Sequence, residues 1–90
     1  MIQVRIRIMP KDTILDPQGQ TVLHALDSLG FDQASSCRMG KFVILDFPDM
    51  DREELEKEVK SICRRLLVNH NTESWDADYV EMPEKHGSEQ

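Results

Sequence analysis

Three histidines are the first residues of this chain whose types could do chemistry. His24, His70 and His86 lie far apart in the sequence, and none of them belongs to an HxxxH, HExxH or CxxC pattern. Metal sites favour such spacings because they bring two ligands to one face of a helix or turn. The histidines are therefore interpreted as solvated or capping residues, and no metal site is predicted.

Two cysteines are the next candidates. Cys37 and Cys63 are 26 positions apart, and the first twelve residues alternate apolar and polar types instead of forming a signal peptide. We therefore expect a cytoplasmic chain with two free thiols rather than a disulfide. Arg38 could favour the thiolate of Cys37, but no histidine or asparagine partner is recognisable, and Cys63 fits an apolar filler of a helix. No catalytic residue is predicted.

Charged residues suggest binding more than catalysis. The stretch Arg38-Met39-Gly40-Lys41 could hold a phosphate or carboxylate, but it lacks the GxxxxGK[ST] pattern of a P-loop, and an exposed turn is the alternative. The acidic residues of 49–58 coincide with an expected helix start, where carboxylates favour the helix dipole.

A net charge of −6 argues against nucleic acid as a partner, and no apolar run reaches the ~18 residues of a membrane span.

These residues must be positioned by a small domain. The chain has 90 residues, of which 1–82 are expected to form one domain and 83–90 a disordered polar tail. A domain near this size buries only roughly 60 to 65% of its unfolded surface, so self-association or a partner would help it.

The first half of the chain predicts a strand and a helix. Apolar and polar residues alternate over 2–8, which is typical of a half-buried strand. A helix is expected from about 17 to 29, with Asp16 as N-cap, Pro17 in the first turn and Gly30 in the left-handed position after the end. Gly19 fits this helix poorly, which suggests that something approaches its backbone closely.

The second half predicts strands around another helix. Residues 34–47 are strand-like, and Met39-Gly40 leaves a hairpin, a bulge or a bend open. A helix capped by Asp51 is expected to run to about 68, followed by Asn69 as a left-handed terminator and a strand over 73–82. The apolar stripe expected on this helix comprises Leu55, Val59, Ile62, Cys63 and Leu66.

The element order predicts an α+β fold in which two helices pack on one face of a small antiparallel sheet, β-α-β(β)-α-β, close to a ferredoxin-like arrangement. Residues 42–47 are apolar on both parities, so both faces of that strand should be covered. The second face is expected to meet another copy of the chain. The predicted oligomer interface through the sheet comprises Arg5, Arg7, Val43, Ile44 and Leu45.

Taken together, "LDPQG" before a helix, "RMGKFVIL" in the middle strand and "LLVN" before an acidic "ES" resemble the PurS family over roughly residues 1–82. PurS is the small subunit of phosphoribosylformylglycinamidine (FGAM) synthase. The resemblance implies a non-catalytic dimer or dimer of dimers that bridges two larger subunits. PurQ-type glutaminase releases ammonia, and PurL-type synthetase uses it with ATP and Mg²⁺ to amidate formylglycinamide ribonucleotide; no cofactor is expected on this chain.

The resemblance also implies which residues contact the partners. Carried over by position, they are Asp16, Gln18 and Gly19, with Pro17 between them, then Arg38, Gly40 and Lys41, and finally Asn69 and Glu73. The stiffened helix start would form a docking edge, and the two cations would meet acidic groups of a partner. The sequence departs from the family pattern after Asn69, where "HNT" replaces a more apolar connection, and in the added tail.

Three rival functions each require features of their own. A small-molecule-binding regulatory module of ferredoxin-like fold would need a ligand-sized cleft at a dimer interface. An acylphosphatase-like enzyme would need an arginine-bearing anion loop after the first strand, and "MPKDT" has no arginine or glycine to form one. An RNA-binding sheet would need exposed aromatic residues and net positive charge. The regulatory module is the main alternative.

Overall fold

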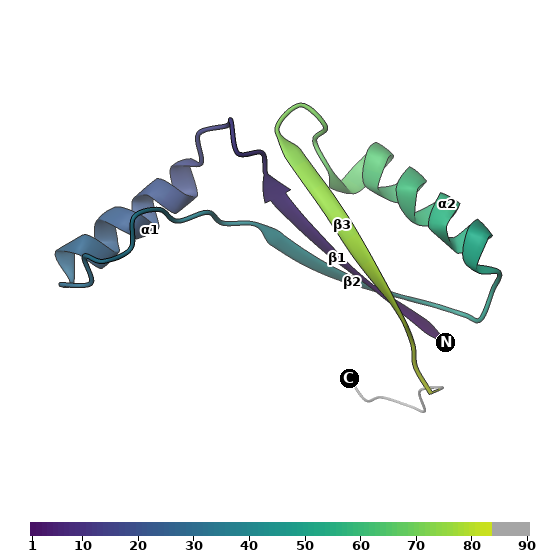
Figure 1. Cartoon of the computed structure of the whole chain (residues 1–90). Helices are drawn as coiled ribbons and strands as arrows, with labels where there is room; N and C mark the ends of the chain where they lie inside the picture. Colours follow the sequence, from purple (N-terminus) through teal and green to yellow (C-terminus); the bar gives the residue numbers. More distant parts are fainter. Residues whose placement is uncertain (84–90) are drawn as a thin grey trace.

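The computed structural model describes residues 1–83 of the chain. Strands and helices alternate along it in the order β1 (Ile2–Pro10), α1 (Pro17–Ser28), β2 (Lys41–Phe47), α2 (Arg52–Ile62), the π-helical turn η1 (Cys63–Leu67) and β3 (Glu73–Glu81), as Figure 1 shows. The strands form one antiparallel sheet in the order β2-β1-β3. The predicted α+β class and element order are confirmed. The predicted disordered tail over 84–90 lies outside the described residues.

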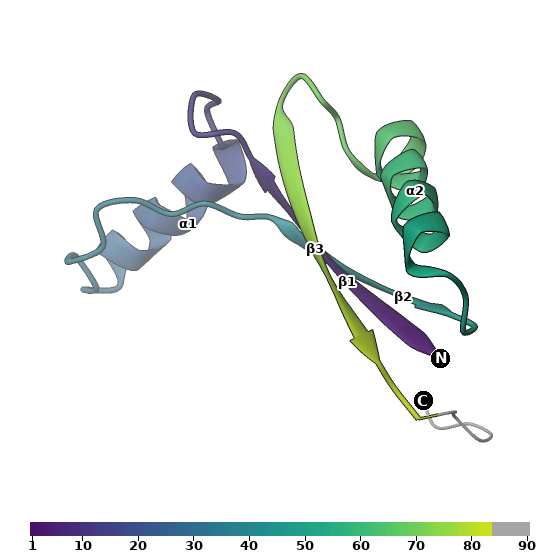
Figure 2. The same ribbon diagram turned by 45° about the vertical axis from the view of Figure 1, so that its right-hand side comes forward.

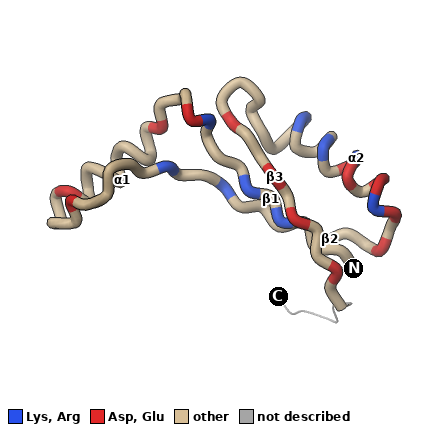
Figure 3. The backbone as a smooth tube through the Cα atoms, in the orientation of Figure 1, with Lys and Arg blue, Asp and Glu red and all other residues tan. Residues whose placement is uncertain are grey.

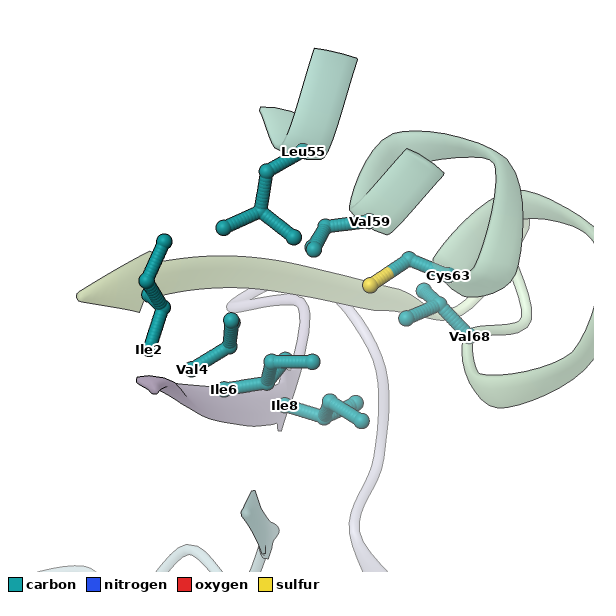
Figure 4. Close-up of a cluster of buried hydrophobic side chains, with 8 residues drawn as sticks. All are labelled: Ile2, Val4, Ile6, Ile8, Leu55, Val59, Cys63 and Val68. Carbon is teal, nitrogen blue, oxygen red and sulfur yellow. The ribbon is translucent and has the colours of Figure 1, made fainter. Parts of the chain in front are cut away.

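β1 is the centre of the sheet and of the hydrophobic core. Its alternating residues Ile2, Val4, Ile6 and Ile8 are buried, as the period of two predicts. Figure 4 shows these side chains pointing from β1 toward apolar side chains of α2 and η1 and toward Val68. The same face of β2 and β3 adds partly buried residues to this core: Val43, Leu45, Phe47, Trp75, Ala77 and Tyr79.

α2 covers that face of the sheet. The Asp51 side chain accepts a hydrogen bond from the Glu54 N–H at 3.3 Å, so the predicted N-cap is confirmed. Leu55, Val59 and Cys63 are fully buried beneath the helix. Burial raises the pKa of the Cys63 thiol above its ordinary value, in keeping with an apolar filler.

The end of this helix differs from the prediction. The Val68 N–H donates to the Cys63 carbonyl at 2.9 Å, which is the i→i+5 hydrogen bond of a π-helical turn. Because the wider turn rotates the later residues, Leu67 and Val68 face the core, and Leu66, predicted to lie in the apolar stripe, is 79% exposed. The left-handed conformation predicted for Asn69 is also wrong, since within residues 1–83 only Gly30 has a positive φ, 93°.

α1 does not lie on the sheet, which corrects the expectation that both helices pack there. Figures 1 and 2 show it extending beyond the end of the sheet on the side away from α2. The Cα radius of gyration is 17.1 Å, against about 12 Å for a compact domain of this length. The cause is the backbone on both sides of α1: a turn follows β1, and residues 31–40 return as an extended segment.

The return from α1 to β2 also differs from the prediction. The C-terminus of α1 is the predicted glycine cap, since the Phe31 N–H donates to the Leu26 carbonyl at 2.8 Å across Gly30. Residues 34–40, however, form no strand, and Met39-Gly40 makes no hairpin. Pairing with β1 starts only at Lys41, opposite Ile8. The last strand agrees with the prediction within one residue.

Candidate functional site

Three connections meet at the end of the sheet nearest α1 and form an open cleft of about 560 Å³. They are the turn between β1 and α1, the segment that leads into β2, and the loop before β3. Five of the eight residues predicted to bind partners line it: Asp16, Gln18, Gly40, Lys41 and Glu73. Gly19, Arg38 and Asn69 do not line it, but each contacts one of the three connections. Residues far apart in the sequence thus form one surface.

Asp16 joins the start of α1 to the segment before β2. Its carboxylate accepts a hydrogen bond from the Met39 N–H at 2.8 Å and makes no side-chain capping hydrogen bond to its own helix. The Met39 N–H is the largest cause that lowers the pKa of Asp16, and the nearby N–H groups of Gly19 and Gln18 also favour the charged form. Asp16 is therefore an N-cap by position, but its carboxylate mainly links two segments.

Gly19 and Gly40 allow the backbone segments to approach closely. Gly19 is the one buried residue of α1, and a Cβ built there would overlap the Cys37 carbonyl. A Cβ at Gly40 would overlap the carbonyl of Ile8 and the sulfur of Met9. In both places the obstacle includes backbone, which cannot move aside without shifting a whole segment. The close approach inferred at Gly19 from the sequence is confirmed.

Lys41, Asn69 and Glu73 connect the first residue of β2 to the loop before β3. The Glu73 carboxylate accepts from the Asn69 N–H at 2.9 Å and lies 3.8 Å from the Lys41 ammonium. Asn69 also accepts from the Thr72 and Glu73 N–H groups through its carbonyl and from the Asn71 N–H through its side chain. Glu73 is thus mostly engaged within the chain, while the Lys41 ammonium is exposed at a long ion-pair distance and can meet a further anion.

Arg38 supports the turn that follows β1. Its guanidinium donates to the Pro10 carbonyl and lies 3.1 Å from the Asp12 carboxylate. Arg38 does not line the cleft and Lys41 does, so the two cations do not face a common site for an anion. The stretch 38–41 is thus a junction between segments, in which Arg38 is engaged within the chain and Lys41 makes only the 3.8 Å ion pair with Glu73.

The apolar walls of the cleft were not predicted from the sequence. Ile14 and Leu15 lie in the turn before α1, Met39 lies in the segment before β2, and Pro10 and Pro17 complete the lining. Leu15 is largely exposed. The available signal was an apolar pair between the expected strand and the expected helix, in a connection where residues are usually polar.

The predicted oligomer residues divide between the two faces of the sheet. Val43 and Leu45 lie on the face covered by α2, and Ile44 lies on the other face, half exposed. Arg7 is on that outer face, where its guanidinium lies 2.7 Å from Asp76 and 3.1 Å from Asp78. The Asp78 hydrogen bond is the first cause that raises the pKa of Arg7.

Arg5 lies on the same outer face and donates to the Gln3 side chain at 2.7 Å. Phe42, opposite Arg7, is also largely exposed there. The outer face therefore carries a basic β1 between an acidic β3 and a β2 that presents Phe42, Ile44 and Asp46, and the charges of β1 and β3 are visible in Figure 3.

The fold and the cleft define a small α+β domain in which three connections meet at an open cleft. Within residues 1–83 no group of three or more His, Cys, Asp or Glu side chains could hold a metal ion. In the same residues no helix is long and apolar enough to cross a membrane.

The comparison with known proteins names the family. The family model "PurS: Phosphoribosylformylglycinamidine (FGAM) synthase" matches residues 3–81. Phosphoribosylformylglycinamidine synthase subunit PurS of Bacillus subtilis is 34% identical over 82 residues, 91% of this chain and 96% of the relative. The Mycobacterium leprae subunit is 37% identical over 76 residues, 83% of this chain and 91% of the relative. A solved structure of Bacillus subtilis PurS superposes with a TM-score of 0.83, covering 90% of this chain and 100% of that chain. The chain belongs to the PurS family.

Proposed function

We propose that this chain is the non-catalytic small subunit of FGAM synthase in purine biosynthesis. In this role it bridges a glutaminase of the PurQ type and an ATP-dependent synthetase of the PurL type, so that ammonia released from glutamine reaches formylglycinamide ribonucleotide. Membership of the PurS family supports the subunit assignment. The bridging role rests on the observation that three connections converge on one open cleft.

The cleft suits a protein partner. Its walls are apolar at Ile14, Leu15 and Met39, and the exposed Lys41 ammonium lies at its edge. A partner could bury an apolar side chain against these walls and place a carboxylate on Lys41. The rigid backbone contacts at Gly19 and Gly40 hold the surface in place before binding, which lowers the entropic cost of association.

A structural neighbour supports the identity of the partners. A chain in a structure described as PurLQS from Thermotoga maritima shares the fold with a TM-score of 0.78 at 24% identity. For this chain we propose the corresponding synthetase and glutaminase as partners, in the cytoplasm. ATP and Mg²⁺ are assigned to the synthetase partner, and this chain is proposed to bind neither.

The test is glutamine-dependent conversion of formylglycinamide ribonucleotide by the cognate synthetase and glutaminase, with and without this chain. We expect activity from glutamine only when the chain is present, while ammonium supports turnover without it. Full glutamine-dependent activity in its absence would remove the bridging role and favour the regulatory module.

Lys41→Ala tests the cleft as the docking surface. The side chain is exposed and makes only a 3.8 Å ion pair, so the domain should remain folded while assembly with the partners weakens. Lys11→Ala is a matched control, because Lys11 is also exposed but does not line the cleft. Equal assembly by both variants, measured by size-exclusion chromatography of the mixed subunits, would exclude the cleft.

Self-association through the outer sheet face is the second part of the proposal. Ile44 is a half-exposed apolar residue near the middle of β2 on this face, so Ile44→Asp should keep the helical circular dichroism signal and dissociate the oligomer. Ser28→Asp is the control, since it adds the same charge at an exposed position of α1, away from the sheet. An unchanged oligomer in Ile44→Asp by light scattering would place the contact elsewhere.

A further inference from the structure

A group of cations lies far from the cleft, on α2 and η1. Lys57, Lys60, Arg64 and Arg65 are exposed and, together with Leu66, are called the basic patch here. They are four of the 11 Lys and Arg residues in a chain of net charge −6, gathered within nine positions. Figure 3 shows basic residues along α2 toward its C-terminal end, while acidic residues dominate its start.

The cations of the basic patch have no carboxylate partner within residues 1–83. Arg52, at the other end of α2, differs in this respect: it lies 3.7 Å from Glu56 and its guanidinium is 4.8 Å from the centre of the Tyr79 ring. The helix dipole favours cations near a helix C-terminus. It does not account for an apolar side chain exposed among them.

Leu66 is that side chain. The π-helical turn directs Leu67 and Val68 into the core and leaves Leu66 on the surface, 79% exposed. It lines a shallow groove on the surface of α2 together with Ile62, with the cations Lys57 and Arg65 and with two carboxylates, Glu54 and Glu58. Cys63, the first residue of this turn, is buried in the core. On the exposed side, the His70 imidazole lies 3.3 Å from the Arg64 carbonyl. Both contacts fix the position of the turn.

We propose that the basic patch is a second docking surface, which binds an acidic segment with an apolar side chain on a larger subunit of the synthase complex. This inference rests on the proposed function. Partner carboxylates would pair with the cations of the patch, while the partner's apolar side chain covers Leu66 and Ile62. A free phosphate or nucleotide would leave Leu66 exposed, so the combination favours a protein segment.

The experiment measures binding of the full chain to the separately purified cognate synthetase and glutaminase by surface plasmon resonance at two salt concentrations. Arg65→Glu and Leu66→Ser should each weaken binding to one of the two subunits by roughly tenfold. The loss in Arg65→Glu should be larger at low salt because the contact is ionic. Arg65→Lys and Leu66→Met are the matched controls and should bind within about twofold of the parent chain.

The outcomes separate this inference from the proposed function. If Lys41→Ala loses binding while Arg65→Glu and Leu66→Ser bind normally, the basic patch is excluded and the cleft remains. If the parent chain binds neither subunit, both proposals fail. If Leu66→Ser instead changes the oligomeric state of the chain alone, the patch is a contact between copies and the inference is overturned.

Discussion

The two helices of this chain are held by different forces. α2 lies over the centre of the sheet, and its Leu55 and Val59 are 0% exposed. α1 extends beyond the sheet, and Leu29 at its end is 72% exposed. Apolar burial fixes α2. α1 is fixed at its first turn, by the Asp16 carboxylate and by the close approach of Gly19 to Cys37.

This difference indicates that folding and assembly depend on separate parts of the molecule. The hydrophobic core comprises β1, the inner faces of β2 and β3, α2 and the turn after it. No residue of α1 belongs to that core. α1 and its junction can therefore be altered with limited effect on the core, and changes there should affect binding first.

The largest effect should come from Leu55→Ala. Removing a fully buried leucine loses its transfer free energy and leaves a cavity, so the free energy of unfolding should fall by about 2 to 5 kcal/mol. Leu29→Ala is the matched control on α1 and should change it by less than about 0.5 kcal/mol, since surface substitutions usually have small effects. Urea denaturation followed by circular dichroism measures both.

Equal losses in the two variants would contradict the comparison. They would mean that α1 is buried in solution, for example against a second copy of the chain. Repeating the denaturation at several protein concentrations separates these cases, because burial between copies makes the unfolding midpoint depend on concentration.

Local patterns predicted the elements well. The alternation over 2–8 identified β1, the capping residue Asp51 identified the start of α2, and Gly30 identified the end of α1. These features depend on neighbours in the sequence, such as the period of a strand or the φ of one residue. The eight residues predicted to bind partners came from the resemblance to a family; five of them line the cleft, and its apolar walls were not predicted.

Non-local geometry could not be predicted in the same way. The position of α1 depends on the backbone path of the turn before it and of the extended segment after it. An apolar stripe on a helix shows that one face can be buried, but not whether the chain's own sheet or another chain buries it. The π-helical turn depends on Val68 entering the core, which moves Leu66 to the surface. A regular helical period cannot anticipate one wider turn.

An intermediate effect is expected from Gly19→Ala. The new methyl group would meet the Cys37 carbonyl, and overpacking of this kind costs roughly 1 to 3 kcal/mol. The better helix propensity of alanine, up to about 1 kcal/mol, offsets only part of it. We therefore expect a small net loss of stability, together with a displaced α1 and weaker assembly with the partner subunits.

Gln20→Ala is the control, because Gln20 is the exposed neighbour of Gly19 in the same turn. Amide chemical shifts of the two variants locate the change: Gly19→Ala should shift residues 16–20 and 37–40 and leave the core of β1 unaffected. Identical spectra for the two variants would mean that the contact with Cys37 is not close in solution.

The smallest effect should be the pH dependence of Asp16→Asn. The Met39 N–H, with smaller contributions from Gly19 and Gln18, lowers the pKa of Asp16 in the folded chain below the ordinary value of about 3.9. A carboxylate with a lowered pKa stabilises the fold above the unfolded pKa, and this contribution is lost as the pH falls through the folded pKa.

Asparagine keeps the carbonyl acceptor for Met39 but has no charge. Other carboxylates contribute equally to the parent chain and to Asp16→Asn, so the difference between their urea midpoints reports Asp16 alone. This difference should be constant above about pH 5, where Asp16 is charged, and should shrink below about pH 4 as Asp16 becomes protonated. A constant difference down to pH 3 would show that charge on Asp16 does not hold α1 to the segment before β2.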